Sequence, residues 1–171
     1  GSTTVGQVMP RAGEAGMQAM MKWLEETETP DTVQYQVLQH TEDEKIKAAM
    51  AEVLTKRAKA TLPEIDNSLE VAMMQNQSKA IVPVLEEAIK NPEVAPKTKD
   101  GFMDAIVKIQ GDRATSFFAE VVRTQKGLLR WVAAQRLIEV RGKAGILAAA
   151  NALPLEYEAY EGEDLSKEMG I

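Results

Sequence analysis

The stretch from Lys126 to Asn151, KGLLRWVAAQRLIEVRGKAGILAAAN, carries the clearest helical pattern of the chain. Arg141-Gly142-Lys143 divides it into two helical runs, the second of which is rich in alanine. One such pair of helices cannot bury its apolar side alone, so neighbouring pairs must cover it. The stretch therefore predicts a fold built from helical hairpins. In its first run, the positions that recur at helical spacing are Leu129, Val132, Ala133, Arg136, Leu137 and Val140.

Helical periodicity extends over most of the remaining sequence, and the period-two alternation of a half-buried strand is absent over any useful length. We therefore predict an all-α fold with about nine helices. Two capping-box signatures, Thr41 to Glu44 and Thr61 to Glu64, are expected to open helices. Asp112 is expected to be an N-cap, and Pro92 to Pro96 a turn between helices.

Helix starts recur at a regular interval. Ala80 and Ala114 each open a helical run, and they are 34 residues apart. Gly111 and Gly142 each precede a helix, and they are 31 residues apart. Two helices for every 30 to 35 residues is the spacing typical of α-solenoids, in which each hairpin packs on the hairpins before and after it.

The sequence from 78 to 153 resembles HEAT-like repeats. Arg130 to Gly142 is similar to the second helix of that repeat, whose consensus runs Val-Arg, two spacers, Ala-Ala, a spacer, Ala-Leu and a glycine. Asp112 to Val122 is similar to the first helix, and Pro92-Glu93-Val94 falls where the family has a turn between helices. The match departs from the family pattern at Lys99, where an arginine is expected, and at Leu129, which replaces valine. Before Ser78 only the helical pattern agrees.

The resemblance implies an α-α superhelix in which the second helix of each hairpin lines the concave side. Carried onto this sequence, that side would offer Lys99, Asp104, Lys108, Arg130, Gln135, Arg136 and Glu139. Trp131 and Trp23 are either core anchors or partner hot spots, and the packing interpretation is preferred for both. The predicted partner-binding set is Lys99, Lys108, Arg130, Trp131, Gln135 and Arg136.

Three regions are expected along the chain. Residues 1–12 form a flexible lead-in that starts with a cloning remnant, Gly1-Ser2, and residues 13–154 form the HEAT-like domain. Residues 155–171 are acidic and bear tyrosines, and we expect them to cap the last hairpin because terminal repeats need a polar cover. The nine methionines are expected to lie mostly in the core, although methionine-rich surfaces also serve adaptable binding.

Composition excludes several kinds of site. The chain has no cysteine, so disulfides, thiolate metal sites and a cysteine nucleophile are absent. A lone histidine, His40, is expected to be a solvated residue at a helix end rather than a metal ligand. Adjacent acidic residues such as Glu25-Glu26 and Glu86-Glu87 point in different directions on a helix, so we expect solvated faces rather than a catalytic pair. The glycines after Arg141 predict a turn, because a phosphate loop needs a preceding strand. No cofactor or metal is expected.

Charge is unevenly distributed along the chain. The net charge is −6, which argues against a general nucleic-acid binder. Residues 97–143 nevertheless hold ten Lys or Arg against five Asp or Glu, a local net charge of +5, which leaves −11 elsewhere. A partner could recognise this uneven charge, or the acidic and basic parts of one surface could simply balance each other.

We therefore expect a soluble, non-catalytic protein-binding or scaffold domain. The alternative is an enzyme or nucleic-acid module on the same scaffold, as in HEAT-like bilin lyases and DNA glycosylases, that uses the basic zone 97–143. A compact helical bundle without repeats is a third possibility. No apolar run reaches the length of a membrane span. Location stays open between bacterial cytoplasm and periplasm, including a domain of a secreted or lipid-anchored parent.

Overall fold

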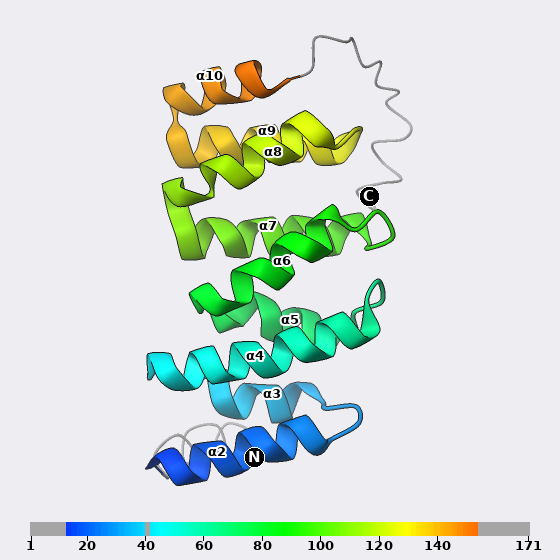
Figure 1. The fold of residues 1–171 in the computed structure, drawn as a ribbon, viewed down its shortest axis with the longest axis vertical. Coiled ribbons are helices and arrows are strands. Elements are labelled where there is room, and N and C mark those ends of the chain that lie inside the picture. The colour runs from blue at the N-terminus through cyan, green and yellow to red at the C-terminus, as the bar shows by residue number, and fades with distance from the viewer. Residues whose placement is uncertain (1–12, 40–41, 154–171) are drawn as a thin grey trace. The chain divides into compact units, whose positions relative to one another are not determined.

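The computed structural model describes residues 13–39 and 42–153. Every regular element in these two ranges is a helix, which confirms the all-α prediction for the part of the chain that is described (Figure 1). The chain divides into two compact units, Gly1–Leu85 and Glu86–Ile171. The expected lead-in 1–12, His40, Thr41 and the acidic segment 155–171 lie outside the described residues.

The helices follow one another through short connections. The first unit contains α2 (Gly13–Glu26), α3 (Thr32–Gln39), α4 (Glu44–Thr61), α5 (Asn67–Asn76), the 3-10 helix η2 (Lys79–Ile81) and the start of α6 (Val82–Lys90). The second unit contains the end of α6, then α7 (Pro96–Gln110), the 3-10 helix η3 (Gly111–Ala114), α8 (Thr115–Thr124), α9 (Leu128–Arg141) and α10 (Lys143–Ala152). None of the described helices is both long and apolar enough to cross a membrane.

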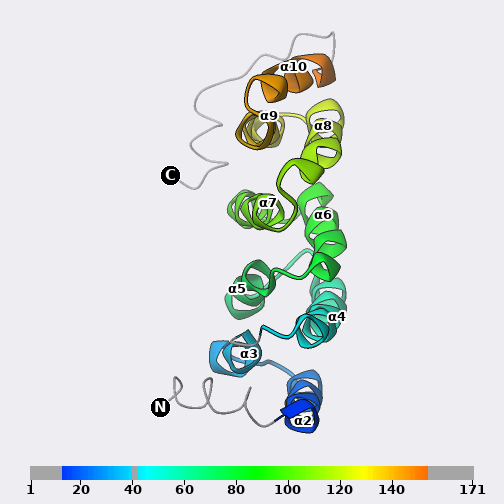
Figure 2. The ribbon, with the colours of Figure 1, turned by 90° about the vertical axis from the view of Figure 1, so that its left-hand side faces the viewer.

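Each unit has its helices in two layers. In the first unit α2 packs on α4 and α3 packs on α5, so that alternate helices are neighbours (Figure 2). In the second unit α8 packs on α10 and α7 packs on α9 in the same way. Consecutive helices also pack against each other, most extensively α8 with α9 and α9 with α10. Helix α8, for example, is covered both by its sequence neighbour α9 and by the next helix but one, α10.

The helix starts in the first unit differ from the predicted capping boxes. Thr61 does not open a helix: it is the last residue of α4, and its hydroxyl donates to the carbonyl of Arg57 at 3.1 Å. The next helix, α5, begins at Asn67, and Asp66 caps it by accepting from Leu69 N at 2.9 Å. Helix α4 begins at Glu44 and is capped by Asp43. The short acidic side chains next to each helix provide these caps, because they reach the unpaired backbone N–H groups.

Asp112 is not an N-cap either. It lies inside η3, and its backbone carbonyl accepts from the hydroxyl of Thr115. The 3-10 helix leads directly into α8, so no extended residue precedes α8 where a capping side chain could act. The predicted turn around Pro92 is present, and it ends where Pro96 opens α7.

Two glycines shape the α9–α10 hairpin. Gly142 is the only residue between the two helices and has φ +58°, a conformation that glycine adopts without steric cost. Gly145, three residues later, lies so close to α9 that an added Cβ would be 2.1 Å from the carbonyl oxygen of Leu137. The glycines after Arg141 therefore make a turn, as predicted, and also allow two backbones to touch.

The core is made of the predicted apolar positions. Met17, Met20, Met50, Met73 and Met103 are buried, so most of the methionines in the described ranges are core residues, as predicted. Phe102, Ile106, Phe118, Val122 and Leu137 are fully buried in the second unit. In the first unit the largest fully buried side chain is Tyr35, which the sequence analysis did not single out. Burial raises the pKa of its phenol, and the charge of Arg57 partly opposes that shift.

Arg57 has an unexpected role at the end of α2. Its guanidinium donates to the backbone carbonyls of Leu24, Glu25, Thr27 and Glu28. The last carbonyls of a helix lack partners within the helix and carry the negative end of its dipole, so a cation there is favourable. Arg57 lies in the last turns of α4, but the carbonyls that it contacts follow or belong to the end of α2.

Candidate functional site

Helix α9 separates the predicted partner-binding residues onto two faces. Arg130, Ala133, Ala134 and Leu137 are buried against the rest of the unit. Trp131 and Ile138 are 46% and 43% exposed, and Gln135 is exposed between them. Positions four and seven residues apart lie on one side of a helix. Trp131, Gln135 and Ile138 thus form one exposed surface, called here the Trp131 face.

The preferred packing interpretation for the two tryptophans is wrong. Trp131 is nearly half exposed, and Trp23 on α2 is 48% exposed. Each lies one residue away from the buried positions of its helix, as Leu24 is buried next to Trp23. Tryptophan is a frequent binding hot spot because it offers a large apolar surface together with a polar N–H.

Arg130 lies inside the second unit, although it is a cation. It is 5% exposed, and its Nε donates to the carbonyl of Val122 in α8 at 2.9 Å. This contact ties the start of α9 to the end of α8, where backbone carbonyls lack helical partners. The guanidinium of Arg130 is therefore used within the protein.

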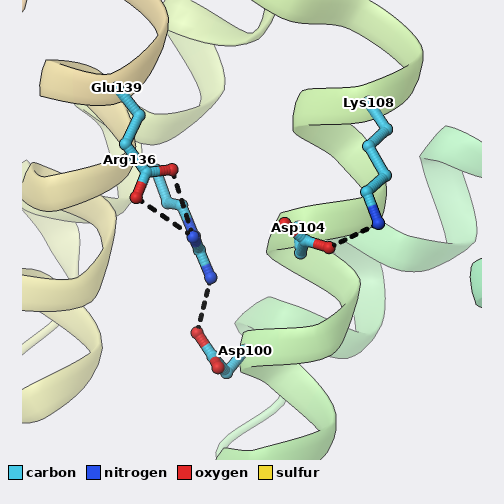
Figure 3. Close-up of polar contacts among 5 residues, drawn as sticks. All are labelled: Asp100, Asp104, Lys108, Arg136 and Glu139. Atoms are coloured by element: carbon cyan, nitrogen blue, oxygen red, sulfur yellow. Dashed lines mark hydrogen bonds and ion pairs between the residues drawn. The ribbon is translucent and has the colours of Figure 1, made fainter.

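Arg136 is also used internally. Its Nη2 donates to Asp100 Oδ1 of α7 at 2.8 Å, and its Nη1 lies 3.1 Å from Glu139 Oε2 on its own helix (Figure 3). Burial alone would lower the pKa of Arg136, but hydrogen bonds and charge from Glu139 and Asp100 outweigh it and raise that pKa. Arg136 stays charged and links α9 to α7. Charge reversal at this position would disturb the fold as well as any interface.

Lys108 lies on the same side of α7 as the Arg136 link. Its Nζ pairs with Asp104 one turn earlier at 3.0 Å, and both side chains are about half exposed (Figure 3). An exposed pair of this kind contributes little to stability. Lys108 therefore remains available at the surface as predicted, although the structure does not bring it to Lys99 or Trp131 through any contact.

Lys99 is the most unusual of the predicted residues. It is only 8% exposed, and no described residue accepts a hydrogen bond or forms an ion pair with its ammonium group. Burial lowers the pKa of Lys99, because removal from water disfavours the charged form. Lys99 was predicted on a partner surface, but it lies in the wall of a cavity.

The cavity lies beside the first turns of α7 and α9 and has a volume of about 290 Å³. Its walls are largely apolar, and Lys99 and Asp100 of α7 contribute the charged groups together with Lys126 of the α8–α9 turn. The apolar lining residues are Pro92, Val94, Pro96, Leu128, Leu129 and Val132. Ligand sites generally combine such apolar walls with few polar groups.

Acidic side chains in the described ranges do not form a metal-binding cluster. Among the described residues, no three acidic side chains lie close enough together to hold a metal ion. Glu25 pairs with Lys56 at 3.0 Å, and Glu44 lies 3.6 Å from Lys47. Burial raises the pKa of Glu86, Lys90 lowers it and Glu120 raises it further. These contacts are exposed or half-exposed pairs of the ordinary surface type.

No protein-family model, curated protein or solved structure matches this chain. The assignment of function therefore depends on the residues and their geometry. Of the predicted set, Trp131 and Gln135 share an exposed face, whereas Lys99, Arg130 and Arg136 are turned to internal or cavity positions. Ile138 was missed, although its place seven residues after Trp131 signals a shared face.

Proposed function

We propose that this chain is a non-catalytic protein-binding domain built from HEAT-like helical hairpins, and that the Trp131 face is its contact surface. The observation that carries the proposal is the exposure of Trp131 and Ile138 on one side of α9. Apolar side chains gathered on one face are the usual core of a protein interface, and tryptophan is enriched among its hot spots.

The two-layer packing supports the repeat part of this proposal. Within each unit, alternate helices are neighbours. That is the packing expected if like hairpins stack side by side into an α-α superhelix. The 34-residue spacing from Ala80 to Ala114 agrees with that size of repeat.

Charge indicates the chemistry of the partner. Residues 97–143, which include all of α9, carry a net charge of +5. Ion pairs inside this zone, such as Arg136 with Asp100, remove one charge of each sign and leave that net charge unchanged. Exposed Arg141 follows Ile138 by one turn. We therefore propose an acidic protein partner that places an apolar side chain on the Trp131 face, because complementary charge favours encounter and orientation.

The nucleic-acid alternative lacks a specific supporting observation. Three of the ten Lys and Arg residues in its basic zone are withdrawn from the surface: Arg130 and Lys99 are buried, and Arg136 is held by two carboxylates. A phosphate-tracking surface needs cations that face solvent together. We therefore retain protein binding as the single proposed function.

Site-specific photo-crosslinking tests the proposal. A benzophenone amino acid at Gln135, between Trp131 and Ile138, should crosslink to an acidic protein in source cells, and the same probe at exposed Gln18 of α2 should not. The captured protein is then purified and its affinity for the unmodified chain is measured. The proposal requires direct binding by the purified pair, and it is overturned if both probe positions capture the same proteins or the purified pair does not bind.

A further inference from the structure

We propose that the cavity between the first turns of α7 and α9 is a binding site for a small organic acid, a carboxylate attached to an apolar body. The carboxylate would pair with the ammonium group of Lys99, and the apolar body would lie against Leu129 and Val132. This site is separate from the Trp131 face and does not depend on the proposed function.

The first argument is the state of Lys99. The side chain of Lys99 is buried, but its ammonium nitrogen is not among the buried polar atoms that lack contact with solvent, as is common for lysine. Lys99 is more than nine-tenths buried, lines the cavity, and has no acceptor among the described residues. Its neighbour Asp100 pairs with Arg136 at 2.8 Å and not with Lys99. The missing acceptor is the group that a bound anion would supply.

The second argument is the composition of the walls. Six of the ten lining residues are apolar: Pro92, Val94, Pro96, Leu128, Leu129 and Val132. A free inorganic anion would gain nothing from these walls, because it would lose its hydration without gaining other hydrogen-bond donors. An apolar group loses no hydrogen bonds there and gains from leaving water. The ligand must therefore combine an apolar body with a polar head.

The third argument concerns the charge of the head group. Two lysines border the cavity, Lys99 with a buried side chain and Lys126 with an exposed one, and the charge of Asp100 is offset by Arg136. The single positive charge of Lys99 balances a monoanion. Charge-assisted hydrogen bonds of the N⁺–H···O⁻ type are about twice as strong as neutral ones, so a carboxylate fits better than a neutral amide. The volume of about 290 Å³ limits the ligand to a small molecule.

A pair of matched probes tests this inference. The intact chain, labelled with ¹⁵N, is titrated with 3-phenylpropionate and separately with 3-phenylpropionamide, which has the same ring and chain but no charge. We expect saturable shifts of the amide signals of Lys99, Leu129 and Val132 with the acid. The amide should bind at least about tenfold more weakly, because it cannot form the charge-assisted contact.

Two variants complete the test. Lys99→Met keeps most of the length of the side chain and removes the charge, and it should weaken acid binding at least about tenfold. Lys108→Met removes an exposed cation from the same helix and should leave acid binding unchanged. The inference is overturned if acid and amide bind alike, if Lys99→Met binds the acid as the parent chain does, or if shifts appear only near exposed Trp131.

A measurement on the unmodified chain covers the case in which Lys99→Met does not fold. The ¹³Cε signal of Lys99 reports the protonation of its ammonium group. Saturation with 3-phenylpropionate should raise the pKa of Lys99, because an adjacent carboxylate favours the charged form. An unchanged pKa of Lys99 at saturation would also overturn the inference.

Discussion

Arg136 Nη2 of α9 lies 2.8 Å from Asp100 Oδ1 of α7, a contact between residues that are 36 positions apart in the chain. The side chain of Arg136 is 15% exposed and also contacts Glu139. This pair joins two helices of the same layer in the second unit. Arg136, which was predicted on a partner surface, is therefore a structural link between α7 and α9.

Arg136→Met should therefore lower the free energy of unfolding by about 1 to 2 kcal/mol, because it leaves Asp100 without its partner in a half-buried setting. Urea denaturation followed by circular dichroism measures this change. Lys108→Met is the matched control, since it breaks an exposed pair on the neighbouring helix and should change stability by less than about 0.5 kcal/mol. Equal effects of the two substitutions would contradict the structural role of Arg136.

The contact of Arg57 with the end of α2 makes a second prediction. Arg57→Met removes hydrogen bonds to several backbone carbonyls and should destabilise the protein by about 2 kcal/mol. Lys56→Met removes only an exposed pair with Glu25 and should cost less than about 0.5 kcal/mol. Hydrogen exchange should show faster exchange of the last α2 amides in Arg57→Met alone. If α2 exchanges equally in both variants, Arg57 does not hold the end of that helix.

The close approach at Gly145 makes a third prediction. Gly145→Ala would place a Cβ 2.1 Å from the backbone of α9, so α10 must move away at a cost of about 1 to 3 kcal/mol. Ala150→Ser, at an exposed position of the same helix, should be within about 0.5 kcal/mol of the parent chain. The midpoint of thermal unfolding reports both changes. An unaltered midpoint in Gly145→Ala would show that the two helices are farther apart than described.

The pH dependence of stability tests the burial of Lys99. Because burial lowers the pKa of Lys99 in the folded state, the unfolded state binds more protons between the two pKa values, and stability rises with pH there. The cost of the buried charge is present at neutral pH and disappears as pH approaches the unfolded value of about 10.4. Lys99→Met should therefore be more stable than the parent chain at neutral pH, by about 1 kcal/mol.

Urea denaturation at pH values from neutral to about 10 follows the difference between Lys99→Met and the parent chain. That difference should shrink as pH rises, because only the parent chain contains the titrating group. A difference that stays constant over this range would mean that Lys99 has the same pKa in the folded and unfolded states.

Helical periodicity predicted the helices because it reports burial on one side of each element. It could not place the helix starts, since several short polar side chains compete for each cap: Asp66 rather than Thr61 caps α5. The sequence also could not predict that Gly145 touches the backbone of α9, because such a close approach depends on how two helices cross.

The candidate site was predictable only where position on one helix decides it. Gln135 follows Trp131 by four residues, so their shared face can be inferred from spacing alone. Arg130 and Lys99 look like surface cations in the sequence, and their burial depends on neighbours from other helices. Charge by itself therefore could not distinguish a partner-binding residue from one that lines a cavity.

The Trp131 face can be tested by measuring the affinity of the purified acidic partner for two tryptophan variants. Trp23 and Trp131 are both about half exposed, but only Trp131 belongs to the proposed contact face. We predict that Trp131→Ala weakens binding at least about tenfold, as for an interface hot spot, and that Trp23→Ala leaves the Kd unchanged, with both variants fully folded. Equal Kd values for Trp131→Ala and the parent chain would contradict the account.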